Sequence, residues 1–243
     1  MMTKTNFSNS NKIEKYFSGA IEQKLSPDSV RFALDNTLME LPHIGFPLRL
    51  YSEQSLQKFA FLPPETRSQI IESLKFRLIV LSEIEIQAPG LESRLVRHAF
   101  DKMHLKCESN FLEKIKSHDI VEIYSLKNIQ AFANFEFFRN STYSLLDLSV
   151  MTWDELFSRN TLVTAELHGK ISKMMTSGNS IEEYSVRPHV VKEKISLNRK
   201  SFLIFMGQMA PVYSSSGERF GMIHTLRVNE IKAGATTSLV LDN

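Results

Sequence analysis

A histidine in an apolar strand is the side chain of this sequence best suited to chemistry. The segment RFGMIHTLRV, residues 219–228, has the composition of a β-strand, in which alternate residues project from one face. His224 therefore shares a face with Met222 and Leu226. Two interpretations are open: a core histidine hydrogen-bonded to backbone, or a polar group that faces a ligand pocket and could ligate haem iron. The second makes His224 a candidate cofactor-binding residue.

Four other side chains are candidates to line the same pocket. Met206 belongs to the neighbouring apolar run SFLIFMGQMAPVY, residues 201–213, and Met222 follows in the next strand. Methionine fills irregular cores and also lines adaptable pockets. Tyr143 and Trp153 are large aromatic residues between the predicted strands, and for Trp153 a core anchor is the simpler expectation. The sequence does not identify a cofactor.

No arrangement of residues indicates catalysis or a metal site. The 9 glycines form no phosphate-binding loop, and HExxH, GxSxG and CxxC are absent. Cys107, the single cysteine, lies on an apolar stripe and is expected to be a buried structural thiol. The neighbouring acids Asp154 and Glu155 have no second catalytic partner. We therefore expect no enzyme activity.

Composition is that of an intracellular globular protein. Hydrophobic residues make up 42% of the chain and charged residues 23%, with 29 basic and 27 acidic side chains for a net charge of +2. This balance gives no electrostatic reason to expect direct nucleic-acid binding. No membrane span or secretory signal is expected, since no apolar run is long enough. One cysteine suits a reducing compartment, so the expected location is the cytoplasm or nucleus.

The order of predicted elements suggests two parts with tails. Residues 1–11 are polar without periodicity and are expected to be a disordered tail. Residues 12–118 are expected to be helical, with Ser26 capping one helix and residues 91–117 forming the longest helix. Residues 119–231 alternate between strand and helix in the order β-β-α-α-β-β-β, with a helix that stops at Gly178. Residues 232–243 are expected to be a C-terminal tail.

Residues 119–230 resemble a PAS domain. DIVEIYSLKNIQAFAN, residues 119–134, is similar to the opening hairpin of that family, after which Asn134 begins the helical part. Thr142-Tyr143-Ser144 follows an aromatic-rich helix, with Thr142 in place of the usual glycine. Residues 206–228 follow the family's pattern of Pro-Val, a polar turn with Gly, then Gly-x-Ile-x-Thr-x-Arg. The matching region holds no cysteine, so a flavin-adduct photosensor is not expected.

The resemblance implies a fold. It implies an α+β domain with a five-stranded antiparallel PAS-like sheet and helices on one face, preceded here by the helical region. The helical part also resembles the region before the PAS domain of fungal zinc-cluster activators of gluconeogenesis, although this chain lacks the six-cysteine DNA-reading cluster.

The expected function is therefore non-catalytic regulation or sensing through protein–protein interaction, in transcriptional regulation. The alternative is a sensor with a small molecule or haem in the domain core. We expect a protein partner or a homodimer to bind through the N-terminal helices or the PAS sheet.

Overall fold

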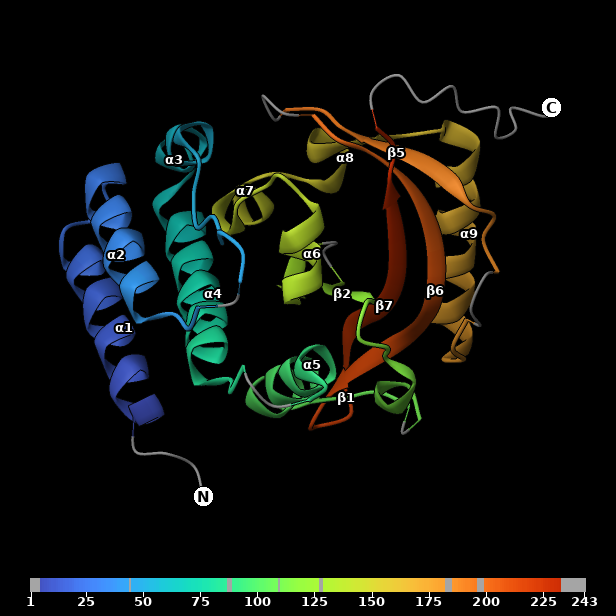
Figure 1. Cartoon of the computed structure of the whole chain (residues 1–243), viewed down its shortest axis with the longest axis horizontal. Coiled ribbons are helices and arrows are strands. Elements are labelled where there is room, and N and C mark those ends of the chain that lie inside the picture. The colour runs from blue at the N-terminus through green and yellow to red at the C-terminus, as the bar shows by residue number, and fades with distance from the viewer. Residues whose placement is uncertain are drawn as a thin grey trace.

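The computed structural model describes residues 5–43, 45–86, 89–108, 110–126, 129–181, 185–195 and 199–232, with side chains from residue 9 onward. Four helices of the first part lie together on one side of the molecule (Figure 1). They are α1 (Thr5–Glu22), α2 (Pro27–Glu40), α3 (Glu53–Ala60) and α4 (Pro64–Glu83). α5 (Leu91–Lys102) follows them toward the sheet. Ser26 caps α2 by accepting a hydrogen bond from the Ser29 N–H, as the sequence predicts.

The chain is helical from Thr5, so the expectation of a disordered tail through residue 11 is wrong for residues 5–11. Contacts with distant helices hold this segment. The Asn9 amide donates to the Glu40 carbonyl at 3.1 Å, and the Ser10 hydroxyl donates to Glu83 at 2.9 Å. Ile13 and Phe17 are fully buried on the same helix. Glu40 lies 31 residues from Asn9, and Glu83 lies 73 residues from Ser10, so no local sequence pattern predicts these contacts.

The predicted helix over residues 91–117 is too long. α5 ends at Lys102, and His104 adopts a left-handed backbone conformation with φ 52°. A two-residue strand, β1 (Leu105–Lys106), follows and pairs with the end of β6 (Ser201–Ser214). A short 3-10 turn, η1 (Leu112–Lys114), comes next. Pairing with a distant strand overrides the local helical preference of this segment.

A curled antiparallel sheet forms the second part, and the α+β class is as predicted. The strands expected from the sequence are β2 (Ile120–Ser125), β3 (Gln130–Ala133), β5 (His189–Glu193), β6 and β7 (Arg219–Glu230). They are neighbours in the sheet order β3-β2-β7-β6-β5-β4. The predicted count of five strands is wrong, because β4 (Phe157–Arg159) extends one edge and β1 pairs with β6. Both additions are only two or three residues long.

Four helices connect the hairpin β2–β3 to the last three strands. They are α6 (Phe135–Asn140), α7 (Leu145–Val150), α8 (Trp153–Leu156) and α9 (Thr161–Ser177). Ser144 and Asp147 form a capping box at α7. α9 ends at Gly178, whose φ of 75° is a left-handed conformation that glycine adopts without strain. In Figure 1, α6 and α7 lie between the first helices and the sheet.

Both faces of the sheet centre are buried. Glu122, His224 and Leu226 lie on the side toward α6 and α8, where they line a cavity. Residues at the alternate positions, Val121, Ile123 and Ile223, have no exposed surface. The sequence resemblance implied helices on one face, and the burial of these three side chains shows that the other face of the central strands is covered as well.

One hydrophobic cluster runs through the first helices and the sheet. The boundary predicted at residues 118/119 lies within a region whose upstream strand, β1, already belongs to the sheet, and the division into domains stays a prediction. The predicted tail lies outside the described residues from residue 233 onward. Within the described ranges, no helix has both the length and the apolar character required to cross a membrane.

Candidate functional site

His224 pairs with a buried carboxylate in the neighbouring strand. Glu122 and His224 are direct partners across β2 and β7, and His224 Nε2 lies 2.8 Å from Glu122 Oε2. The other carboxylate oxygen, Oε1, accepts hydrogen bonds from the Tyr124 hydroxyl at 2.8 Å and the Gln130 amide at 2.6 Å. Glu122 is only 3% exposed. Three side chains therefore satisfy this buried carboxylate.

These contacts keep Glu122 ionised at neutral pH. Burial alone would raise the pKa of Glu122, but the charge of His224 and the hydrogen bonds from His224, Tyr124 and Gln130 outweigh it, so this pKa lies below its ordinary value. The pKa of Tyr124 moves the other way and lies well above its ordinary value, because the ring is buried beside this carboxylate. Tyr124 is accordingly a neutral hydrogen-bond donor here.

A small cavity lies beside the pair. Its volume is about 50 Å³, and it lies between this face of the sheet, which includes β4, and the helices α6 and α8. Arg159 of β4 lies over the Trp153 ring at 4.1 Å from its centre, and Trp153 stacks on Phe157 at 5.1 Å. Burial lowers the pKa of Arg159 to about 10, which still leaves it a cation at neutral pH. The cavity thus has apolar walls with one carboxylate, one guanidinium and one imidazole.

Two of the five predicted pocket residues, His224 and Trp153, line this cavity. Met206 is buried in β6 and Met222 is half-buried in β7, but neither is among the lining residues. Tyr143 also lies elsewhere. Its hydroxyl donates to the Leu156 carbonyl and accepts from the backbone N–H of Lys194 at 3.0 Å. Tyr143 thus joins α8 to the end of β5.

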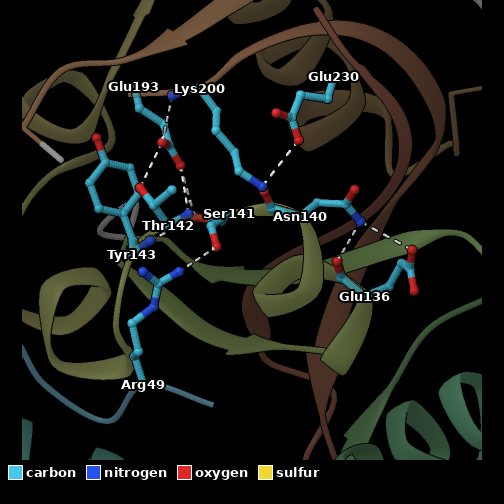
Figure 2. Close-up of polar contacts among 9 residues, drawn as sticks. All are labelled: Arg49, Glu136, Asn140, Ser141, Thr142, Tyr143, Glu193, Lys200 and Glu230. Carbon is cyan, nitrogen blue, oxygen red and sulfur yellow. Dashed lines mark hydrogen bonds and ion pairs between the residues drawn. The ribbon is translucent and has the colours of Figure 1, made fainter. Parts of the chain in front are cut away.

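A second buried carboxylate anchors one wall of the cavity. Glu193 of β5 is 3% exposed and accepts hydrogen bonds from the Thr142 N–H at 2.7 Å and the Thr142 hydroxyl at 2.6 Å (Figure 2). It also accepts from the Lys200 N–H at 3.0 Å. One side chain therefore ties the link between α6 and α7 to the connection between β5 and β6.

The same link is held from two further directions. The Lys200 ammonium donates to the Asn140 carbonyl at 3.0 Å and pairs with Glu230 at 3.1 Å (Figure 2). Arg49, from the connection between α2 and α3, donates to the Ser141 carbonyl at 3.1 Å. Since Asn140 and Ser141 line the cavity, contacts from both parts of the chain fix its wall.

The residues around His224 do not fit haem. His224 Nε2 is engaged by Glu122, and pockets for drug-sized molecules have volumes of about 300–1,000 Å³, several times that of this cavity. The cavity has room for about one water molecule, whose share of liquid volume is about 30 Å³. The alternative of a haem or similar ligand in the core is therefore not supported. Among the described residues, no three His, Cys, Asp or Glu side chains gather to hold a metal ion.

Sequence reasoning missed Glu122, Arg159 and Glu193. A signal was present for Glu122, because the strand DIVEIYS places a carboxylate in an apolar run, two residues from Tyr124. A charged residue within a strand that is buried on both faces needs a partner. Arg159 and Glu193 carry no such signal, since their strand environments depend on β4 pairing with β5.

Comparisons with known proteins give distant structural similarity and no match in sequence. No protein-family model matches the chain, and no curated protein matches it in sequence. Among solved structures it is similar to one described as an RNA-binding light-oxygen-voltage receptor, with 11% sequence identity and a TM-score of 0.29. The similarity covers 89% of this chain and 65% of the receptor chain, so this chain spans less than two thirds of its length. A TM-score of 0.29 establishes no common fold, and RNA binding is a property of that receptor.

Proposed function

We propose that this chain is a PAS-type regulatory protein that acts by binding another protein and catalyses no reaction. Supporting the PAS assignment is the succession of β2-β3, short helices, α9 and β5-β6-β7, which matches the order expected from the sequence resemblance. The filled core favours a protein-binding role over a sensor with a cofactor in the sheet, since only about 50 Å³ is open beside His224. The resemblance to zinc-cluster activators suggests transcriptional regulation, in the cytoplasm or nucleus.

The observation that carries the protein-binding role is the outward face of α2. Phe32 is 64% exposed and Met39 is 83% exposed. Residues seven apart lie on one face of a helix, so the two side chains form a single apolar strip. Asp28 and Asp35 are exposed on the same face. Five of the eight exposed large apolar side chains of the described chain belong to the first three helices or directly follow them: Ile21, Phe32, Leu38, Met39 and Phe61.

A groove borders the C-terminal end of α2. Leu38, at 44% exposure, lines an apolar groove of about 540 Å³ whose other walls include Phe46, Leu81 and Phe135. A groove of this volume can accept one or two large apolar side chains of a partner, which is how interfaces gain most of their binding energy. The strip and the groove together are called the α2 surface below.

The charge of the α2 surface selects the chemistry of the partner. Arg31 is the single basic residue of α2, and it is paired with Glu53 at 2.7 Å. The carboxylates of Asp28 and Asp35 beside the strip therefore favour a partner helix whose apolar residues are flanked by Lys or Arg. A second copy of this chain would place like charges opposite each other across a two-fold axis.

The proposal is tested with two fluorescent amphipathic peptides that share one apolar face, flanked by Lys and Arg in one and by Glu in the other. We expect the basic peptide to bind the full chain at least about tenfold more tightly than the acidic peptide does. Its affinity should fall as the salt concentration rises. Phe32→Glu with Met39→Glu should abolish this binding, while Leu162→Glu, at an exposed position on α9, should leave it unchanged. Equal binding of the two peptides, or none, would overturn the proposal. If the wild-type chain self-associates and Phe32→Glu removes this self-association, the occupant of the α2 surface is a second copy of the chain and not a different protein.

A further inference from the structure

A cleft distinct from the His224 cavity and from the α2 surface lies along the second half of β6. Its volume is about 540 Å³, within the range of about 300–1,000 Å³ that small-molecule sites occupy. Three segments form it: the described chain after β1 (residues 107–108 and 110–114), the turn from Gly178 to Ile181 after α9, and β6 from Gln208 to Tyr213. The protein-binding role proposed above makes no use of this cleft.

A bulge in β6 directs one side chain to the cleft. Gly207 and Gln208 together oppose Thr225 of β7, because the pairing register shifts between Met206 and Met209. A Cβ at Gly207 would lie 2.2 Å from the Thr225 hydroxyl oxygen, so only glycine fits there. The Gln208 N–H donates to that same hydroxyl at 3.0 Å, which fixes the bulge. Bulges often re-aim a side chain beside a functional site, and here the Gln208 side chain lines the cleft.

Several polar groups of the cleft have no hydrogen-bond partner within the described part of the chain. The side chains of Asn110, Asn179 and Gln208, and the Tyr213 hydroxyl, make no hydrogen bond to any other residue that the structure describes. Tyr213 is nevertheless held in place. The Arg219 guanidinium lies 5.8 Å from the centre of its ring and donates a hydrogen bond to the Met175 carbonyl. The three amides and the hydroxyl are thus open to a ligand.

The charges of the cleft balance. Lys114 and Glu108 are its two charged lining residues, and Glu108 accepts a hydrogen bond from the Ser180 hydroxyl. An anionic or cationic ligand therefore gains no net attraction. Amides offer two donors and one acceptor oxygen, and a tyrosine hydroxyl both donates and accepts. A ligand that matches these side chains carries several uncharged groups, each able to donate and accept hydrogen bonds.

We propose that this cleft is a binding site for an uncharged polyhydroxylated small molecule, of the size of one or two sugar rings. Gln208, Asn179 and Asn110 provide the hydrogen bonds, and Tyr213 provides a hydroxyl and a ring edge. Pro211 and Ile181 add apolar surface against which the C–H faces of such a ligand pack. Occupancy of this site is independent of the α2 surface and of the His224 cavity.

The test measures binding of neutral monosaccharides, disaccharides and linear polyols to the full chain by saturation-transfer NMR and calorimetry. Sugar phosphates and uronic acids of matched size are the charged comparison. We expect saturable binding of at least one neutral compound and weaker binding of its charged counterpart. Gln208→Ala and Asn179→Ala should each weaken it about tenfold or more, because each removes a hydrogen-bonding amide. Gln57→Ala, at an exposed position on α3, is the matched control and should change nothing.

Cys107 supplies an independent readout, since it is the single cysteine of the chain and lines this cleft. Burial, with a smaller contribution from Glu108, raises the pKa of the Cys107 thiol to about 11, so alkylation by iodoacetamide is measured above pH 9. A bound neutral ligand should slow this reaction several-fold. The proposal is overturned if no neutral compound binds, if the charged compounds bind better, or if both amide variants bind as the wild type does with their folds intact by circular dichroism. None of these results bears on the peptide experiment, so the two proposals fail separately.

Discussion

His224 Nε2 and Glu122 Oε2 lie 2.8 Å apart across β7 and β2, although 102 residues separate them in the sequence. Glu122 has no other basic side chain within hydrogen-bond distance among the described residues. A buried carboxylate that loses its partner keeps the cost of desolvation without the compensating attraction. The two residues should therefore behave as one unit.

A double-mutant cycle tests this coupling. We expect His224→Leu to lower the free energy of unfolding by about 2–4 kcal/mol at pH 7, because it leaves the Glu122 charge buried without its partner. Glu122→Gln together with His224→Leu should cost less than the sum of the two single changes, by about 1 kcal/mol or more. Urea denaturation of the four proteins measures the effect, and additive costs would show that the pair is not coupled.

Glu92 gives a stability that falls as pH rises. It is 5% exposed on α5, and burial, reinforced by the charge of Glu136, raises its pKa to about 7 despite hydrogen bonds from the N–H groups of Glu136 and Phe135. The folded protein thus binds a proton that the unfolded chain releases near its ordinary pKa of 4.5. The contribution of protonated Glu92 to stability is complete below that value and is lost as pH rises through about 7.

Glu92→Gln removes this pH dependence and keeps a hydrogen-bond acceptor. We expect the variant to be more stable than the wild type by about 1–3 kcal/mol at pH 8 and nearly equal to it at pH 5. Urea midpoints at pH 5, 6, 7 and 8 provide the measurement. A difference that stays constant across this range would mean that Glu92 does not titrate in the folded state.

Glu193 should be among the least replaceable acids of the sheet. Glu193→Ala removes the acceptor of two backbone N–H groups and two hydroxyls, those of Ser141 and Thr142, so we expect a loss of about 2–4 kcal/mol. Glu193→Gln retains one acceptor and should lose about half as much. Glu155→Ala is the control, since Glu155 is an exposed capping residue whose removal should cost about 1 kcal/mol or less. Thermal unfolding ranks the variants, and a Glu193→Ala protein as stable as the control contradicts the anchoring role.

Two glycines should respond to alanine in opposite directions. Gly207→Ala places a methyl group against Thr225 and should lower stability by about 3 kcal/mol or more. A Cβ at Gly19 of α1 meets nothing within 4 Å, so Gly19→Ala should raise stability by about 0.5–1 kcal/mol through the better helix propensity of alanine. Calorimetry on the two variants checks both signs, and a tolerated Gly207→Ala would mean that the β6 bulge is not fixed by this contact.

Local signals in the sequence predicted the elements whose boundaries depend on nearby residues. Ser26 and Pro27 predict the start of α2, and Gly178 predicts the end of α9. The alternation of apolar residues around His224 predicts β7. The candidate site was predictable in part, because alternation places His224 on one face of β7 but does not say what it meets. Its partner Glu122 depends on the register between β2 and β7, which no local pattern specifies. The predictions for the start of α1 and the end of α5 were wrong for the same reason, because distant segments supply the contacts that determine both positions.

The pairing of β1 with β6 determines where the chain can be cut. A fragment that begins at residue 119 would leave Tyr213 and Ser214 without the neighbour that Leu105 and Lys106 provide, and would lose the buried side chains of Phe111 and Ile115. An uncovered strand edge beside exposed apolar surface is a template for aggregation. A fragment made for crystallisation or for display should therefore begin before Leu105, so that it retains β1 as the strand that covers this edge of β6.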